Sequence, residues 1–252
     1  MVSVSPRSSA LLSLALLMTQ CMVPEKVDDG LVATYSIVAL DPETDELGVA
    51  VQSKFFSVGS VVPWAKAGVG AVATQALCNI RFGPEGLSAM QSGEAPDEAL
   101  KSLLSSDPMA EHRQVGMIDA RGRTAAHTGG ECRDFAAHRI GKNYTVQGNL
   151  LDGPEVIDAM AAAFEAARHS QLPLADCLTR ALQAGEDAGG DKRGRQSAAL
   201  LVVRENGGYM GANDRFIDLR VEDHPDPTQE LARLLTIHRQ FFAERHRSES
   251  NE

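Results

Sequence analysis

Two consecutive segments that are apolar on nearly every residue constrain the fold of this chain most strongly. Residues 34–40 are Thr-Tyr-Ser-Ile-Val-Ala-Leu, and residues 47–52 are Leu-Gly-Val-Ala-Val-Gln. The turn-forming segment 41–46 lies between them, so the pair is typical of a β-hairpin. A strand with one face in water would alternate apolar and polar residues. We therefore expect these two strands to belong to a sheet that is covered on both faces.

The remaining strands and helices are expected in blocks. Strands are expected at 69–75, 114–119, 124–128, 144–151, 197–204 and 216–221, and helices at 83–92, 96–105, 156–168 and 174–187. A last helix should begin after Asp226, because Pro227 follows in the first turn and Gln229 occupies a capping position. This block order favours stacked sheets between helix layers over a doubly wound parallel sheet.

Charge and cysteine content exclude several classes of partner. A net charge of −10 argues against a nucleic-acid partner. The short basic cluster of Lys192, Arg193 and Arg195 lies among glycines and cannot follow a phosphate backbone. The cysteines are Cys21, Cys78, Cys132 and Cys177. Their spacing matches no zinc site or disulfide framework. No organic cofactor motif is visible, so we expect a chain that works without a cofactor.

The first 33 residues differ from the rest of the chain. Arg7 precedes the apolar run 10–18, which has the length of a signal peptide and is too short to span a membrane stably. Cys21 ends a segment similar to a lipoprotein cleavage box, although Gln20 stands where a small residue is usual, so Cys21 is a candidate lipid anchor. We expect residues 1–33 to be a signal peptide or pro-segment, and the protein to be exported to the periplasm or cell envelope. A gene start placed too early would make it cytoplasmic.

The hairpin geometry gives Thr34 a predicted neighbour. If the turn is centred near residues 43–45, antiparallel pairing places Thr34 opposite Ser53 or Lys54. A threonine beside a hydroxyl and an ammonium is a candidate nucleophile. Its α-amine would be the base if the chain began there, because a free α-amino group titrates at about 7.7–8.0. Alternatively, Thr34 is an ordinary strand residue and Lys54 a solvated strand end.

The segment from Gly189 to Arg195, Gly-Gly-Asp-Lys-Arg-Gly-Arg, is the most distinctive loop. Its glycines, Gly190 among them, let the backbone approach a ligand closely. Arg193 or Arg195 could bind a substrate carboxylate through two hydrogen bonds. Asp191 is a candidate for orienting Thr34 or binding a substrate amine. The alternative is a structural ion pair between Asp191 and Arg193 that shapes the loop.

From Thr34 to about His238 the sequence resembles an uncharacterised bacterial family of the N-terminal-nucleophile (Ntn) hydrolase superfamily, which also contains the proteasome β-subunits. The matching stretches are 34–39, 47–55, 62–65, 70–76, 147–150, 188–199 and 218–221. The resemblance implies an α+β fold, a four-layer αββα sandwich of two antiparallel sheets between helix layers. It predicts one domain at 34–246, followed by a frayed tail at 247–252.

The resemblance also implies a mechanism. Thr34 would be the nucleophile at the first residue of the first strand, provided that the Ala33–Thr34 bond is cleaved. Lys54 would keep the amine neutral and stabilise the alkoxide. The Asn149 side chain is a candidate oxyanion donor, as are the backbone amides near residues 189–190. Gln75 would line the substrate cleft.

Two functions remain open on the sequence. The first is an Ntn amidohydrolase that cleaves a small or peptide-like amide. The second is a non-catalytic binding module of the cell envelope that holds a carboxylated ligand with the loop 189–195. The outer helix layers are candidate surfaces for a homodimer. A metal site at Asp223, His224 and Asp226 and a catalytic pair of His127 with Cys132 are the weaker alternatives.

Overall fold

A computed structural model of the chain describes Met1, residues 31–32 and residues 34–249. The predicted signal peptide and the candidate lipid anchor at Cys21 lie outside the described residues, and so does Ala33. Within the described part of the chain, no helix is long and apolar enough to cross a membrane.

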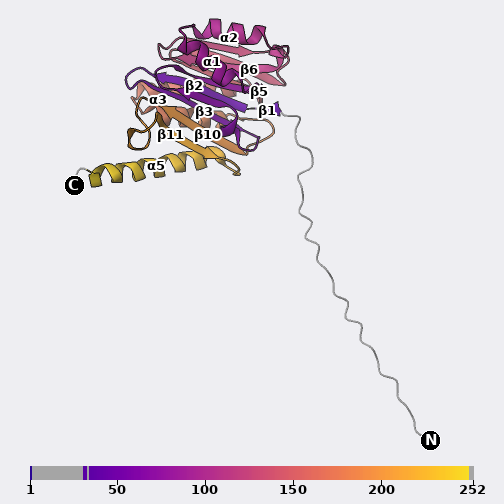
Figure 1. The fold of residues 1–252 in the computed structure, drawn as a ribbon. Coiled ribbons are helices and arrows are strands. Elements are labelled where there is room, and N and C mark those ends of the chain that lie inside the picture. The colour runs from indigo at the N-terminus through magenta and orange to yellow at the C-terminus, as the bar shows by residue number, and fades with distance from the viewer. Residues whose placement is uncertain (2–30, 33, 250–252) are drawn as a thin grey trace.

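The strands form two antiparallel sheets (Figure 1). The six-stranded sheet has the order β11 (Arg215–Val221), β10 (Ser197–Val203), β3 (Glu46–Ser53), β2 (Thr34–Asp41), β9 (Tyr144–Leu151) and β8 (Phe135–Gly141). The five-stranded sheet contains β1 (Leu31–Val32), β5 (Gly70–Leu77), β6 (Arg113–Asp119) and β7 (Thr124–Thr128), with β4 (Pro63–Lys66) also paired to β5. The chain therefore passes from one sheet to the other between β1 and β2.

Helices cover the outer face of each sheet. The five-stranded sheet carries α1 (Phe82–Gln91) and α2 (Pro96–Ser105), and the six-stranded sheet carries α3 (Glu155–His169), α4 (Leu174–Asp187) and α5 (Pro227–Glu249). Figure 1 shows the resulting order of layers, from α1 and α2 through both sheets to α5. The predicted four-layer αββα sandwich of two antiparallel sheets is confirmed. The last helix continues beyond residue 246, the predicted end of the domain.

The first hairpin lies at the centre of this sandwich because both of its strands are apolar on both faces. Every residue of β2 and β3 is buried. On β2, Tyr35 and Ile37 pack into the core beneath α3 and α4, whereas Val38 and Leu40 pack into the core between the sheets. The predicted double coverage of this sheet is confirmed. Strands β4 and β8, in contrast, were not expected from the sequence.

Candidate functional site

Thr34 begins β2 near the middle of the six-stranded sheet. Its register partner on β3 is Ser53, one of the two predicted neighbours. The Thr34 hydroxyl donates a hydrogen bond to Ser53 Oγ at 3.1 Å, and both residues are 0% exposed. Since successive side chains of a strand point to opposite faces, Thr34 and Ser53 share the face that looks toward the second sheet.

Lys54 directly follows Ser53, the last residue of β3. Its side chain is exposed, and its Nζ donates to the backbone carbonyl of Arg195 at 3.4 Å. The structure therefore supplies Thr34 with a hydroxyl neighbour and holds the ammonium at the surface. This arrangement matches the alternative interpretation of Lys54 as a solvated strand end.

A group of buried polar side chains fills the space between the sheets next to Thr34. We call it the amide cluster; its members are Ser36, Gln75, Gln114, Thr145 and Gln147, all 0% exposed. Gln147 Nε2 donates to Ser36 Oγ, and the Ser36 hydroxyl donates to Gln75 Oε1, both at 2.6 Å. Thr145 Oγ1 donates to Gln147 Oε1 at 2.8 Å. Buried polar groups are costly unless they are hydrogen-bonded, and this cluster meets that condition.

Gln75 connects the amide cluster to Thr34. Its Nε2 donates to the Thr34 carbonyl at 3.2 Å and to Gln114 Oε1 at 2.8 Å. Gln114 Nε2 in turn donates to the Gly148 carbonyl at 2.8 Å and to Thr128 Oγ1 at 3.0 Å. Gln75, predicted to line a cleft, thus reaches the backbone of Thr34 and holds it from the opposite sheet.

The side-chain nitrogen of Asn149 is hydrogen-bonded, whereas its side-chain oxygen has no partner among the described residues. Its Nδ2 donates to Gln114 Oε1 at 3.0 Å. Its Oδ1 is buried and has no hydrogen-bond partner among the described residues, although Asn149 is only 1% exposed. Pairing of Tyr35 with Gly148 places Asn149 at the strand end beside Thr34. An unpaired buried acceptor costs about 1–3 kcal/mol, so Asn149 Oδ1 is an acceptor that a donor could stabilise.

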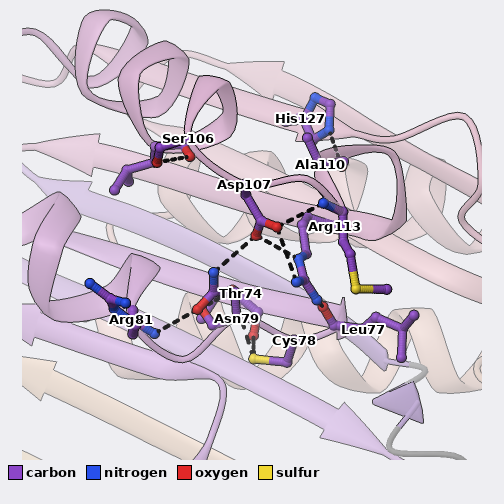
Figure 2. A network of polar contacts seen from close by, with 12 residues as sticks. Thr74, Leu77, Cys78, Asn79, Arg81, Ser106, Asp107, Ala110, Arg113 and His127 are labelled. Atoms are coloured by element: carbon purple, nitrogen blue, oxygen red, sulfur yellow. Dashed lines mark hydrogen bonds and ion pairs between the residues drawn. The ribbon is translucent and has the colours of Figure 1, made fainter.

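A second polar network fixes the end of β5, the strand that carries Gln75 (Figure 2). Asp107 accepts hydrogen bonds from Arg113 Nε and Asn79 Nδ2, both at 2.9 Å, and Arg113 Nη1 also donates to the Leu77 carbonyl. The bonds from Arg113 are the main cause that lowers the pKa of Asp107 to about 2. The Leu77 backbone pairs with Leu31 of β1, so this network supports the place where the segment before Thr34 docks.

The glycine-rich loop is tied together by Asp191. Its buried carboxylate accepts the backbone N–H groups of Lys54 at 3.1 Å and Arg193 at 2.9 Å. It also forms an ion pair with the Arg193 guanidinium, with Nη2 at 3.0 Å from Oδ2. The structural ion pair is therefore present. A carboxylate occupied in this way has little capacity left for a substrate amine.

The other predicted binding groups of the loop also have protein partners. Arg195 Nη1 lies 3.2 Å from Glu186 Oε1 and 3.6 Å from Asp226 Oδ1. The backbone N–H of Gly189 donates to the Glu186 carbonyl, and that of Gly190 donates to the carbonyl of Gly185. Both glycines have positive φ angles, 117° and 59°, and end α4 in this way. These two amides are thus part of a helix end and do not point to an oxyanion.

The residues of the candidate metal site and of the candidate His127–Cys132 pair are hydrogen-bonded to other groups. The Asp226 backbone N–H donates to His224 Nδ1, and Asp223 Oδ1 accepts a bond from Gln196. His127 Nε2 lies 3.0 Å from the Ala110 carbonyl, whereas Cys132 Sγ lies 3.5 Å from that of Arg113. Among the described residues, no group of three or more metal-ligating side chains is placed to hold an ion.

The family comparison covers the site and most of the sandwich. The model of a family of unknown function, DUF1028, matches residues 34–231. The chain belongs to this family. The match begins at Thr34 and includes the amide cluster, Asn149 and the glycine-rich loop. No curated protein matches the chain.

Two solved structures resemble this DUF1028 chain. The crystal structure of protein SPO2555 from Silicibacter pomeroyi, described as a DUF1028 protein, is 32% identical. The match covers 81% of this chain and 88% of that one, with a TM-score of 0.73. Anbu, an ancestral beta-subunit from Yersinia bercovieri, is 12% identical, with coverage of 87% and 97% and a TM-score of 0.33. The first similarity supports the family assignment; the second is too low to carry an argument.

Sequence reasoning missed Gln114 and Gln147, the two glutamines that connect Gln75 to the rest of the amide cluster in this DUF1028 domain. A signal for them exists. Strands β6 and β9 are buried on nearly every residue, so a glutamine in them must face a covered layer. A carboxamide in such a layer requires polar partners. Two such residues on strands of different sheets predict a polar network between the sheets.

Proposed function

We propose that this protein is an amide hydrolase whose nucleophile is Thr34 Oγ1, made competent by removal of residues 1–33 during or after export. The observation that carries the proposal is the environment of Thr34. It is the first residue of a central strand, its hydroxyl is bonded to Ser53, and its carbonyl is held by Gln75. The family match also begins at this residue.

The chain before Thr34 is the obstacle to catalysis, and the fold gives two of its residues, Leu31 and Val32, a defined position. The backbone of Leu31 and Val32 pairs with Leu77 and Ala76 at the edge of β5. Thr34 is completely buried, and its nitrogen belongs to a peptide bond. Cleavage of the Ala33–Thr34 bond would release β1 from this edge and create the α-amine that the mechanism needs.

In the processed chain, the α-amine of Thr34 would accept the proton of its own hydroxyl, directly or through a water molecule. Thr34 Oγ1 would attack the carbonyl carbon of the amide and form a tetrahedral intermediate. The C–N bond would then break, and the proton would pass from the α-ammonium to the leaving amine. Water would hydrolyse the resulting ester, which returns Thr34 and releases the carboxylic acid. The chemistry needs no cofactor.

Asn149 supports this proposal in a different role from the oxyanion donor that the sequence suggested, because its Nδ2 already donates to Gln114. Its Oδ1 is a buried acceptor without a donor among the described residues, and cleavage would create new N–H groups at the neighbouring strand start. We infer that Oδ1 accepts a hydrogen bond from the α-amine of Thr34 or from an N–H of the substrate. One hydrogen of Nδ2 is committed to Gln114, which fixes the orientation of the amide.

The binding-module alternative receives less support. It requires Arg193 or Arg195 to bind a carboxylated ligand. Arg193 is only 22% exposed and commits both Nε and Nη2 to Asp191, and Arg195 already faces two carboxylates, those of Glu186 and Asp226. A ligand would have to displace ion pairs that shape the loop. The loop is therefore better suited to connecting the ends of β3 and β9 than to binding a ligand.

The first test is the intact mass and N-terminal sequence of the protein purified from its native host. We expect a chain that begins at Thr34, because only that form has the required amine. A chain that retains residues before Thr34, or one lipidated at Cys21, would contradict the proposal.

The second test uses an acylating β-lactone on the processed chain, followed by mass spectrometry. We expect a single acyl group on Thr34, and labelling at least about 1,000-fold slower in Thr34→Ala. Thr44→Ala is the matched control, because Thr44 lies exposed in the turn of the same hairpin. Equal labelling of folded Thr34→Ala would refute the role of Thr34.

A further inference from the structure

A cavity of about 770 Å³ lies at the opposite end of the six-stranded sheet from Thr34. It is bounded by the loop between β10 and β11, by β11 itself and by α5, whose position along this sheet is visible in Figure 1. Ser197 pairs with Ser53 at the Thr34 end, whereas Arg204 at the cavity follows seven residues later. At about 3.3 Å per residue, the two sites are separated by roughly 20 Å. The cavity is therefore independent of the proposed hydrolase site.

One wall of the cavity consists of aromatic rings. The ring of His238 lies 6.3 Å from that of Phe216 in an edge-on arrangement and 4.5 Å from that of Phe242. Burial lowers the pKa of His238, which favours the neutral imidazole. Tyr209 also lines the cavity. A volume between about 300 and 1,000 Å³ with aromatic walls is typical of small-molecule sites.

The charged groups of the lining favour an anion. Its charged side chains are Arg204, Arg215 and Asp218. Their ion-pair partners outside the lining are Glu46 and Arg220, so three cations face two anions. The Arg204 guanidinium lies 3.7 Å from the centre of the Phe216 ring and is bonded to Glu46 through Nη1. Arg215 is 66% exposed and reaches Asp218 through Nη1. A guanidinium has five N–H donors, so both arginines can bind a further acceptor.

The loop over the cavity is held in an uncommon conformation. Asn206 and Met210 both have φ 53°, in the left-handed region that residues other than glycine rarely adopt. Gly208 packs so closely against the Asn213 side chain that a Cβ there would overlap it. Backbone strain of this kind costs about 1–3 kcal/mol per residue and is concentrated at ligand sites. The strained loop places the flexible Met210 at the mouth of the cavity.

We propose that this cavity binds a small planar aromatic molecule that carries a carboxylate. The ring packs against the aromatic wall formed by Phe216, His238 and Phe242, and the carboxylate binds the guanidinium groups of Arg204 and Arg215. This site goes beyond the proposed amide hydrolysis and does not depend on it, because none of its groups contacts Thr34 or the amide cluster.

The test is isothermal titration calorimetry of the full chain with naphthalene-2-carboxylate. We expect saturable binding of one molecule per chain. The uncharged naphthalene-2-carboxamide should bind about tenfold more weakly, because it loses the charge-assisted hydrogen bonds. Cyclohexanecarboxylate, which keeps the charge but not the flat ring, should also bind more weakly. Absence of naphthoate binding, or equal affinity for the carboxamide, would overturn the proposal.

Variants test whether naphthoate binds in this cavity. Arg215→Gln should weaken naphthoate binding about tenfold and leave carboxamide binding unchanged. Arg233→Gln is the matched control, because Arg233 is an exposed arginine of α5 that pairs with Glu230 outside the cavity. Thr34→Ala should bind naphthoate normally, so failure of the hydrolase proposal leaves this test intact. Binding that is insensitive to Arg215→Gln would overturn the proposal. A dimer that Met210→Ser dissociates would assign the cavity to a second copy of the chain and would overturn it as well.

Discussion

The space between the two sheets is filled in two contrasting ways. Beneath β3, β10 and the later residues of β2 it contains an apolar layer of small aliphatic side chains, among them Val38, Val49, Val51, Val58, Val62, Ala71 and Ala73. Beneath β2 and β9 it contains the amide cluster. Aliphatic packing is tolerant of position, whereas each carboxamide must meet donors and acceptors at fixed points. The polar half therefore specifies the relative position of the sheets, and it does so beside Thr34.

Of the substitutions that would disrupt the amide cluster, Gly116→Ala should have the largest effect. A Cβ at this position of β6 would overlap Gln147 Oε1 and Thr145 Oγ1, so Gly116 makes the space that the cluster occupies. We expect a loss of about 3–5 kcal/mol in the free energy of unfolding, from overpacking and broken hydrogen bonds together. Urea denaturation measures it. Gly130→Ala is the control, because its nearest neighbour is the end of the Glu111 side chain at 3.3 Å. Equal stability of the two variants would contradict the tight fit.

A double-mutant cycle distinguishes the two halves by their cooperativity. We expect Gln75→Leu and Gln114→Leu each to cost about 3 kcal/mol, because buried partners lose their bonds. Their coupling energy should be about 1–3 kcal/mol, since the two side chains share a bond of 2.8 Å. The control cycle, Val38→Ala with Val49→Ala, joins register partners of the apolar half. Its coupling should be about 0.5 kcal/mol. Equal coupling in both cycles would remove the distinction.

The sequence was sufficient to predict the structure of the apolar half of the layer between the sheets, but not that of the polar half. The run of aliphatic residues in β2 and β3 predicted a doubly covered hairpin, and the turn position predicted Ser53 opposite Thr34, as observed. Helices α2 and α4 have the predicted bounds because their apolar periodicity is regular. Strand β8 was missed because most of its residues are exposed and show no alternation.

The partners of the amide cluster depend on long-range contacts. Gln75 and Gln147 are 72 residues apart in the sequence, and only the stacking of the two sheets brings them together. The register of the first hairpin was predicted only to within one residue, with Ser53 or Lys54 opposite Thr34, and the structure selects Ser53. A shift of one residue moves a side chain to the other face of the sheet. Site prediction from a strand pattern therefore depends on exact register.

The charged network of Figure 2 should differ from the uncharged amide cluster in its response to pH. Arg113 lowers the pKa of Asp107 to about 2, below its ordinary value of about 3.9. The ionised carboxylate therefore stabilises the fold fully above pH 4, and this contribution is lost as the pH falls through 2. We expect Asp107→Asn to cost about 2 kcal/mol at pH 7 and progressively less between pH 4 and pH 2. Gln114→Leu is the comparison, and its cost should not change over this range. If the stability costs of Asp107→Asn and Gln114→Leu changed in the same way with pH, the stabilising role of the ionised Asp107 carboxylate would be contradicted.

The smallest expected effect lies at His138, where the hydrogen bonds of the amide cluster reach the surface. Thr128 Oγ1 accepts a bond from Gln114 and lies 2.9 Å from His138 Nδ1. In the tautomer that carries its hydrogen on Nε2, His138 Nδ1 accepts the hydrogen of the Thr128 hydroxyl. Burial, and secondarily His127, lower the pKa of His138. Neutral His138 is therefore favoured in the folded state, and stability should be complete above about pH 6.5 and fall as the pH decreases through the lowered pKa.

The His138 ring is partly desolvated, but the residue as a whole is exposed, so solvent screening limits this effect to a few tenths of a kcal/mol. Stability is thus a poor measure, and side-chain NMR is a better one. Protonation at Nδ1 removes the acceptor for Thr128, so the carboxamide resonances of Gln114 should shift with the titration of His138. The methyl resonances of Val49, in the apolar half, should not. His138→Asn should abolish the shift at Gln114. Titration shifts of equal size at Gln114 and Val49 would show that the two halves of the layer respond as one.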